Sequence, residues 1–268
     1  MTSSTQSKKV SLSDAISWSL KLYSDNFFPL LKLALLGAIP SVIYQLAVEV
    51  QPGANGGLWV LSLIAILTGL VFFTAMIRSI ACIHGGRTSI LTELVGEGFK
   101  RFWSFLGALI LVGLAQILAS LGIVFCSMVF EHTTLVIIVL LTFAVLCALI
   151  MALVYISTVS VFFPFALVLN DEGPVAALRR SFNIVHKSFW PVLGAIMLLF
   201  VIAAAVSLPI MIGLRMLGTH LAIMTATMAG IGIVLTPFMI AYMFRLFITL
   251  EQDATTVGIS IYDKAPSA

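Results

Sequence analysis

The sequence is poor in charged side chains, which make up only 9% of its 268 residues, whereas soluble proteins carry about 25%. Hydrophobic residues make up 61% of the chain, and its mean hydropathy is +1.16. A water-soluble protein of this composition would have too few polar side chains to cover its surface. The shortage of charge therefore excludes a water-soluble fold and indicates that lipid surrounds much of the chain.

The chain also lacks a large excess of charge of one sign, since it has 14 basic and 11 acidic residues. This balance predicts no nucleic-acid partner. The polar start of the chain is not followed by a short apolar run with a small-residue cleavage site. We therefore expect no cleaved signal peptide, and the first apolar run belongs to the mature protein.

Cysteine is scarce as well. Cys82, Cys126 and Cys147 all fall in apolar segments. An odd number of cysteines without close spacing excludes a zinc motif and a disulfide framework. We expect buried free thiols that pack as small apolar side chains.

The sequence is rich in long apolar runs. A helix needs about 20 apolar residues to cross the hydrocarbon core of a bilayer. The runs are continuous rather than alternating, which predicts helices and not barrel strands. Pro164 and Pro237 lie in the second halves of two long runs, where we expect kinks. The predicted spans are Phe27–Val48, Leu58–Ile83, Phe102–Phe130, Thr134–Leu169, Phe189–Leu214 and Leu221–Leu250.

The basic residues are distributed to one side of these six spans. Six crossings place both termini on one side, and thirteen of the fourteen basic residues belong to that side if Lys32 and Arg245 extend to its surface. The positive-inside rule then predicts cytoplasmic termini. The expected organisation is a tail over 1–10, a membrane domain over 11–250 and a second cytoplasmic tail over 251–268.

Three segments share one plan, in which an amphipathic helix leads through an aromatic pair into a span. They are Ser11–Phe28, Ser89–Trp103 and Pro174–Trp190. The chain thus reads as a three-fold internal repeat, whose copies pack around a pseudo-threefold axis or in a row; the alternative is that surface helices are common in any six-span protein. The second segment matches the first at an offset of 75, more weakly. An offset of 162 places Ala15 on Ala177, Ser19 on Ser181 and Pro29 on Pro191.

The predicted fold is an all-α bundle of six transmembrane helices with three amphipathic helices in the cytoplasmic surface. In the third of these helices, Phe182 and Val185 are expected to face the acyl chains. Basic residues at an anionic surface attract anionic lipid. The candidate head-group contacts are Arg179, Arg180 and Lys187 on the third helix, and Lys100 and Arg101 on the second.

Residues that carry catalysis or bind metals are sparse. The four histidines share no metal-ligand spacing. We interpret His84 and the Gly85-Gly86-Arg87 that follows as a helix C-cap rather than a phosphate-binding loop. We interpret Asp171 and Glu172 as complementing the dipole of the next helix, rather than as an acid–base pair. The sequence predicts no catalytic residue, no cofactor and no metal site.

Several segments resemble a known membrane family. Phe163–Pro174 (FPFALVLNDEGP), followed by Ala176–Phe182 and Phe189–Gly194, is similar to the membrane domain of glycerophosphoryl diester phosphodiesterases and to its stand-alone bacterial relatives. The resemblance implies a multi-pass protein of the bacterial cytoplasmic (inner) membrane. In the fused enzymes a separate soluble domain carries out hydrolysis, and no segment here is that domain, so the resemblance does not imply hydrolytic activity.

The sequence leaves two main functions open. The first is a non-enzymatic membrane protein that organises lipid, including anionic lipid, or a membrane or soluble partner protein at the cytoplasmic leaflet. The second is a transporter or flippase for an amphipathic small molecule, although the spans carry no mid-membrane charge of the kind that ion-coupled transporters use. A membrane-embedded enzyme has almost no support in the residues.

Overall fold

The computed structural model describes residues 12–50, 55–87, 90–132 and 136–256. The predicted outer loop over 51–57 and the two tails therefore lie largely or wholly outside the described residues. Over the described ranges the chain is helical and has no strand, which confirms the all-α class. The helices are α1 (Leu12–Asp25), α2 (Phe27–Val50), α3 (Asn55–His84), α4 (Leu91–His132), α5 (Val136–Ser160), α6 (Phe163–Asn170), α7 (Pro174–Lys187), α8 (Phe189–Met216) and α9 (Leu221–Thr256).

Six helical stretches are long and apolar enough to cross a membrane, as predicted. They correspond to α2, α3, α4, α5 with α6, α8 and α9. The first keeps its predicted bounds, Phe27–Val48, and most other predicted ends differ by a few residues. The protein is therefore an integral membrane protein with six spans.

Proline decides where the short helices separate from the spans. A proline inside a helix removes a hydrogen bond to the carbonyl four residues earlier and collides with it. Counting back four residues from Pro29 and Pro191 gives Asp25 and Lys187, where α1 and α7 end. Pro164 has the same effect, because α5 ends four residues before it. The kink predicted at Pro164 is therefore a helix break.

The second predicted surface helix differs from the other two. Ser104 stands where the others have proline, so the helix continues, and α4 runs unbroken from Leu91 to His132. The separate helix predicted over Ser89–Trp103 is therefore the first part of α4, and its first residue lies outside the described ranges. α9 likewise continues past Pro237, where a kink was predicted.

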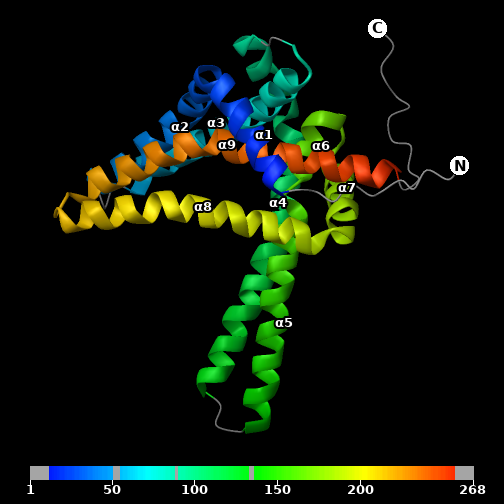
Figure 1. Ribbon diagram of the computed structural model, residues 1–268. Coiled ribbons are helices and arrows are strands. Elements are labelled where there is room, and N and C mark those ends of the chain that lie inside the picture. Colours follow the sequence, from blue (N-terminus) through cyan, green and yellow to red (C-terminus); the bar gives the residue numbers. More distant parts are fainter. Residues whose placement is uncertain (1–11, 51–54, 88–89, 133–135, 257–268) are drawn as a thin grey trace, which may run out of the picture. The chain divides into compact units, whose positions relative to one another are not determined.

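The chain divides into two compact units, residues 1–102 with 194–268, and residues 103–193. In the first unit α2 packs on α3 and on α9, and α1 lies along α9 (Figure 1). In the second unit α7 packs on α5 and α6. Each unit has its own core. The largest fully buried side chains include Tyr242, Phe244, Phe247, Ile77 and Ile80 in the first unit, and Phe162, Phe165, Leu167, Val168 and Val185 in the second.

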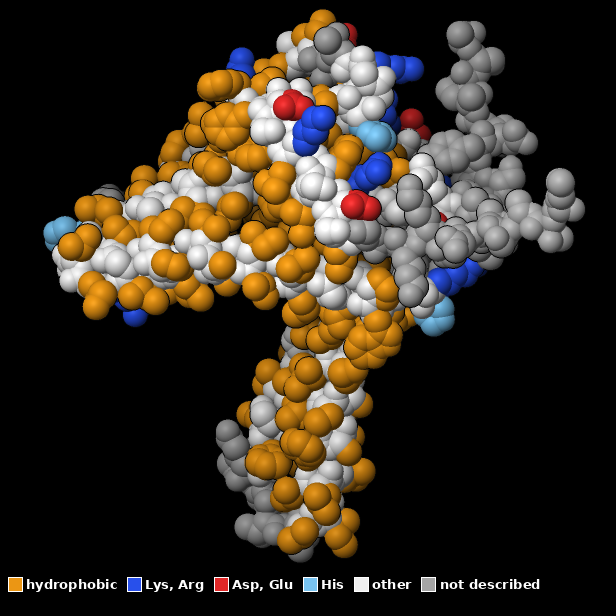
Figure 2. Space-filling model, in the orientation of Figure 1, with side chains coloured by type: hydrophobic (Ala, Val, Ile, Leu, Met, Phe, Trp, Pro, Cys, Tyr) orange, Lys and Arg blue, Asp and Glu red, His pale blue; other side chains and the backbone are white. Residues whose placement is uncertain are grey.

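Apolar side chains also cover the outside of the spans. The hairpin of α4 and α5 shows mainly hydrophobic side chains in Figure 2. Leu118 on α4 and Ile137 on α5 are 70% and 81% exposed. An apolar surface of this extent is stable only against lipid. Cys147 is exposed on this hairpin and Cys82 is half-buried, so the prediction of buried thiols is confirmed only for Cys126.

The helix bounds and the buried positions follow the spacing of the predicted repeat. Moving α1 by 162 residues gives the bounds of α7, and α8 begins 162 residues after α2. The same positions are buried in both copies: Ala15 and Ala177, Ser19 and Ser181, Leu30 and Val192, and Leu33 and Ala195. The three-fold repeat stays a prediction, and these matched positions support it for the first and third copies.

Candidate functional site

A cavity of about 250 Å³ lies between α2, α3 and α9 in the first unit. Small residues leave this space, since Gly37 and Ala38 on α2, Gly69 on α3 and Gly232 on α9 all line it. Its lining on α2 recurs every three or four residues from Leu33 to Gln45. With a rise of 1.5 Å per residue, the cavity follows α2 for about 18 Å.

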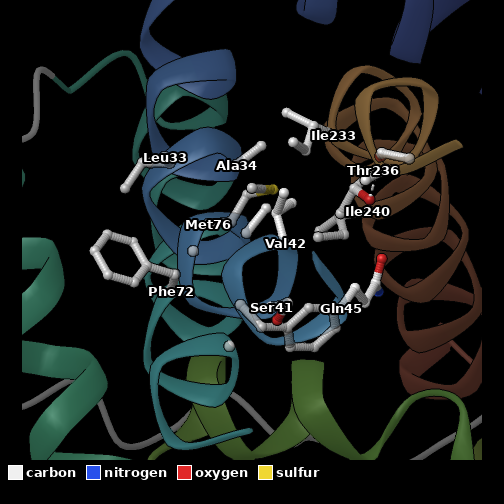
Figure 3. Close-up of a pocket in the computed structure, with 16 residues that line it drawn as sticks. Leu33, Ala34, Ser41, Val42, Gln45, Phe72, Met76, Ile233, Thr236 and Ile240 are labelled. Carbon is white, nitrogen blue, oxygen red and sulfur yellow. Dashed lines mark hydrogen bonds between the residues drawn. The ribbon is translucent and has the colours of Figure 1, made fainter. Parts of the chain in front are cut away.

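The cavity is mostly apolar but carries three polar side chains. Figure 3 shows Ser41 and Gln45 on the α2 side, and Thr236 beside Ile240 on the α9 side. The Thr236 hydroxyl donates to the carbonyl of Gly232 at 2.7 Å. The structure shows no hydrogen bond from Ser41 or Gln45 to any residue it describes. The cavity therefore offers a hydroxyl and an amide to a ligand inside an otherwise apolar space.

A close contact sets the width of the cavity at one wall. A Cβ added to Gly37 would lie 2.7 Å from the Cβ of Phe72, whereas one added to Gly69 or Gly232 would meet nothing within 4 Å. Gly37 thus lets α2 approach α3, and the other two glycines leave open space. The cavity is a consequence of small residues on three helices, of which α2 and α3 approach each other closely at Gly37.

A second, charged pocket lies where the end of α3 meets the first turns of α4. It has a volume of about 470 Å³. Its basic residues are Arg78, Arg87 and Lys100, and its acidic residues are Glu93 and Glu97. These residues all belong to the first unit.

Two of the predicted head-group contacts, Lys100 and Arg101, belong to this region but differ in placement. Lys100 is exposed and forms an ion pair with Glu97 at 3.0 Å. The Arg101 side chain is only 9% exposed and lies 3.6 Å from the same carboxylate. Arg101 is thus held inside the protein, whereas Lys100 lines the pocket. From the sequence, Arg78 belongs only to the basic residues that predict the orientation, and Arg87 belongs also to the predicted C-cap.

The other three predicted contacts lie on α7 in the second unit. Arg179 and Lys187 are exposed, as a head-group contact requires. Arg180 is largely buried and forms an ion pair with Glu172 at 2.5 Å. With its amide oriented to accept, Asn170 also receives hydrogen bonds from Arg180. Arg180 therefore joins the end of α6 to α7, which is a different placement from the head-group layer expected for it.

The buried face of α7 also differs from the prediction. Ala177, Ser181, Ile184 and Val185 are buried against protein, so Val185 does not face acyl chains. Phe182 is 43% exposed and stacks on His186. His186 also forms a hydrogen bond with the hydroxyl of Tyr155 at 3.0 Å. The helix is therefore fixed to α5 by polar and aromatic contacts.

Hydroxyl groups of α1 and α7 bind span carbonyls near prolines. Tyr23 donates to the carbonyl of Val234 at 2.8 Å, three residues before Pro237. Ser181 donates to the carbonyl of Val159, just before the break at Pro164. Each hydroxyl thus joins a short helix to a span at a carbonyl close to a proline. Burial raises the pKa of Tyr23 above its ordinary value, which already lies well above neutral pH, so the hydroxyl is a donor.

An aromatic cluster that sequence reasoning missed joins α1, α3 and α9. The Trp18 ring lies 5.5 Å from His84, 6.3 Å from Phe244 and 5.3 Å from the guanidinium carbon of Arg245. A cation over an indole ring stabilises by about 0.5–2 kcal/mol. Arg245 is therefore fixed on Trp18, rather than simply extending to the surface as expected.

The remaining interpretations concern helix ends. Gly86 has a φ of 67°, and the Arg87 N–H donates to the carbonyl of Cys82 at 2.9 Å, which confirms the C-cap after His84. Asp171 has a φ of 54° and ends α6, and Glu172 lies shortly before α7. Among the residues that the structure describes, no group of three or more His, Cys, Asp or Glu side chains is placed to hold a metal ion.

Comparison with known proteins gives a family. Residues 27–250 match the model of a domain of unknown function (DUF7847), and the chain belongs to this family. The match covers the six spans and leaves out α1. No curated protein and no solved structure matches the chain. The likeness to phosphodiesterase membrane domains stays a prediction.

Proposed function

We propose that this chain is a non-enzymatic integral membrane protein that organises bilayer lipid by binding a lipid acyl chain. The cavity between α2, α3 and α9 carries this proposal. It lies within candidate spans, where hydrocarbon is the surrounding solvent. Its extent of about 18 Å along α2 is comparable with one leaflet of hydrocarbon, about half of 30 Å.

The proposed setting is a bacterial cytoplasmic membrane with both termini in the cytoplasm. The resemblance to the phosphodiesterase membrane domains and the one-sided basic residues support this setting. A partner protein remains part of the proposal, because exposed Arg179 and Lys187 on α7 offer charge to a lipid or a protein. Lipid has the stronger support, since the cavity is matched to hydrocarbon.

A photoactivatable phosphatidylcholine with its reactive group on the acyl chain tests the cavity. The protein is placed in lipid nanodiscs that contain the probe, and adducts are located by mass spectrometry. We expect adducts on cavity residues such as Met76, and a several-fold loss in Gly69→Leu, because the added side chain fills the open space at Gly69.

Gly113→Leu on α4 is the matched control, because a Cβ there also meets nothing within 4 Å and the residue does not line the cavity. Adducts spread evenly over all lipid-facing helices, with no response to Gly69→Leu, would show that the cavity holds no acyl chain. Both variants are first compared by size-exclusion chromatography, so that loss of fold is not taken for loss of binding.

Transport of an amphipathic small molecule is the second candidate. The hydroxyl of Ser41 and the amide of Gln45 favour it, because both are available to a polar group inside the cavity. Movement of a fluorescent phospholipid analogue between the leaflets of proteoliposomes measures this activity. Transport predicts flux that Gln45→Leu reduces, whereas acyl-chain binding alone predicts no flux above empty vesicles.

A further inference from the structure

We propose that the charged pocket at the junction of α3 and α4 binds the phosphate of an anionic phospholipid. This site is separate from the cavity of the proposed function. Gly69 and Arg78 are nine residues apart on α3, roughly two and a half turns, so they lie on opposite faces of the helix. The inference rests on the proposed function only in that both concern bilayer lipid.

The charges in the pocket favour an anion. Glu97 pairs with Lys100 and Arg101, at 3.0 and 3.6 Å. The structure shows no ion pair between Arg78 or Arg87 and a carboxylate that it describes. The pocket thus has three cations against two carboxylates, Glu93 and Glu97, and the buried Arg101 beside it adds a further positive charge. Two guanidinium groups offer the paired donors that bind phosphate oxygens.

An apolar cavity on the same two helices favours a lipid over free phosphate. It has a volume of about 180 Å³ and is lined by residues that include Val71 on α3 and Phe99 and Phe102 on α4. Val71 precedes Arg78 by seven residues, which is about 10 Å along α3 toward the membrane interior in the predicted topology. A phosphate at the arginines would thus have space for hydrocarbon below it.

The pocket lies at the level of the predicted cytoplasmic membrane surface. Arg78 and Arg87 lie on either side of the end of α3, at the side predicted to be cytoplasmic. Arg87 is exposed and Arg78 is half-buried, so both are accessible to a ligand. Glu97 keeps Lys100 directed to the same pocket.

Native mass spectrometry of the detergent-purified protein tests the site. The probes are a short-chain phosphatidylglycerol, a phosphatidylcholine with the same chains, and inorganic phosphate. We expect phosphatidylglycerol to bind more tightly than phosphatidylcholine. A cation near an anionic group contributes a factor of about five to binding. Arg78→Gln and Arg87→Gln should therefore each weaken the binding of phosphatidylglycerol by about fivefold.

Lys21→Gln is the matched control, because it removes one exposed cation from α1, outside the pocket. Arg87→Gln keeps the test decisive if the half-buried Arg78 proves necessary for folding. The proposed site would be overturned if Lys21→Gln weakened phosphatidylglycerol binding as much as the arginine variants do, or if neither arginine variant weakened it. Greater weakening by Arg179→Gln with Lys187→Gln would also overturn it and place the head group on α7.

Inorganic phosphate distinguishes the two sources of the anion. Millimolar phosphate that binds with the same dependence on Arg78 and Arg87 would support an anion site and overturn lipid as its occupant. Failure of the acyl-chain binding proposed for the cavity is recognised separately, since Gly69→Leu should leave the selectivity for phosphatidylglycerol unchanged. The arginine variants should likewise leave acyl-chain adducts at Met76 unchanged.

Discussion

Replacing Gly98 with alanine tests the packing of α4 on α3. A Cβ at Gly98 would lie 2.6 Å from the carbonyl oxygen of Val71 and 3.0 Å from its Cγ1. The oxygen belongs to the backbone, so the two helices must separate by several tenths of an ångström. Overpacking costs about 1–3 kcal/mol, and the better helix propensity of alanine offsets about 1 kcal/mol. The expected net loss of stability is about 0–2 kcal/mol, which places Gly98→Ala about 1–3 kcal/mol below a glycine-to-alanine change without a collision.

Gly96→Ala is the matched control in the same helix. A Cβ there meets nothing within 4 Å, so this variant has the gain in helix propensity without the collision. One kcal/mol shifts the Tm of a chain of this size by about 2–4 °C. Thermal unfolding in detergent should therefore give a lower Tm for Gly98→Ala and an equal or higher Tm for Gly96→Ala. Equal shifts in both variants would refute the close contact of α4 with α3.

Three further predictions concern other contacts. Tyr23→Phe should lower stability by about 1 kcal/mol, because the hydrogen bond to the carbonyl of Val234 is lost. Tyr44→Phe, where the structure shows no such bond, should not, and thermal unfolding compares the two variants. Arg180→Gln should destabilise by about 1–3 kcal/mol and Arg179→Gln by less than about 0.5, since only Arg180 holds Glu172; similar Tm values would count against this ion pair. Reporter fusions at Ala268 and within 51–57 should lie on opposite sides of the membrane, and finding both on one side would exclude the six-span topology.

The spans and their ends were predictable because they follow from local chemistry. Continuous apolar runs specify the spans, and Pro29, Pro164 and Pro191 specify the breaks before or within them. The unbroken α4 could have been predicted as well, because Ser104 lacks the steric conflict of proline. These features depend on residues within four positions of each other.

The two pockets could not be predicted in the same way. The cavity depends on which faces of α2, α3 and α9 meet, and apolar spans give little sequence signal for the direction of each face. The α7 helix shows the same limit, since Val185, which was expected to face the acyl chains, is buried against protein together with Ala177 and Ser181. A helix between protein and lipid has two apolar surroundings, so its hydrophobic pattern alone does not distinguish them.

The basic residues, which the positive-inside rule counts alike, have different environments in the structure. Arg101 and Arg180 are held against carboxylates inside the protein, and their loss should mainly reduce stability. Arg179 and Lys187 are exposed and can act on orientation or on a partner. Arg78 and Arg87 share a pocket with Lys100. A combined neutralisation of Arg179, Arg180 and Lys187 would therefore mix a stability effect with a surface effect, whereas single substitutions separate lipid binding from folding.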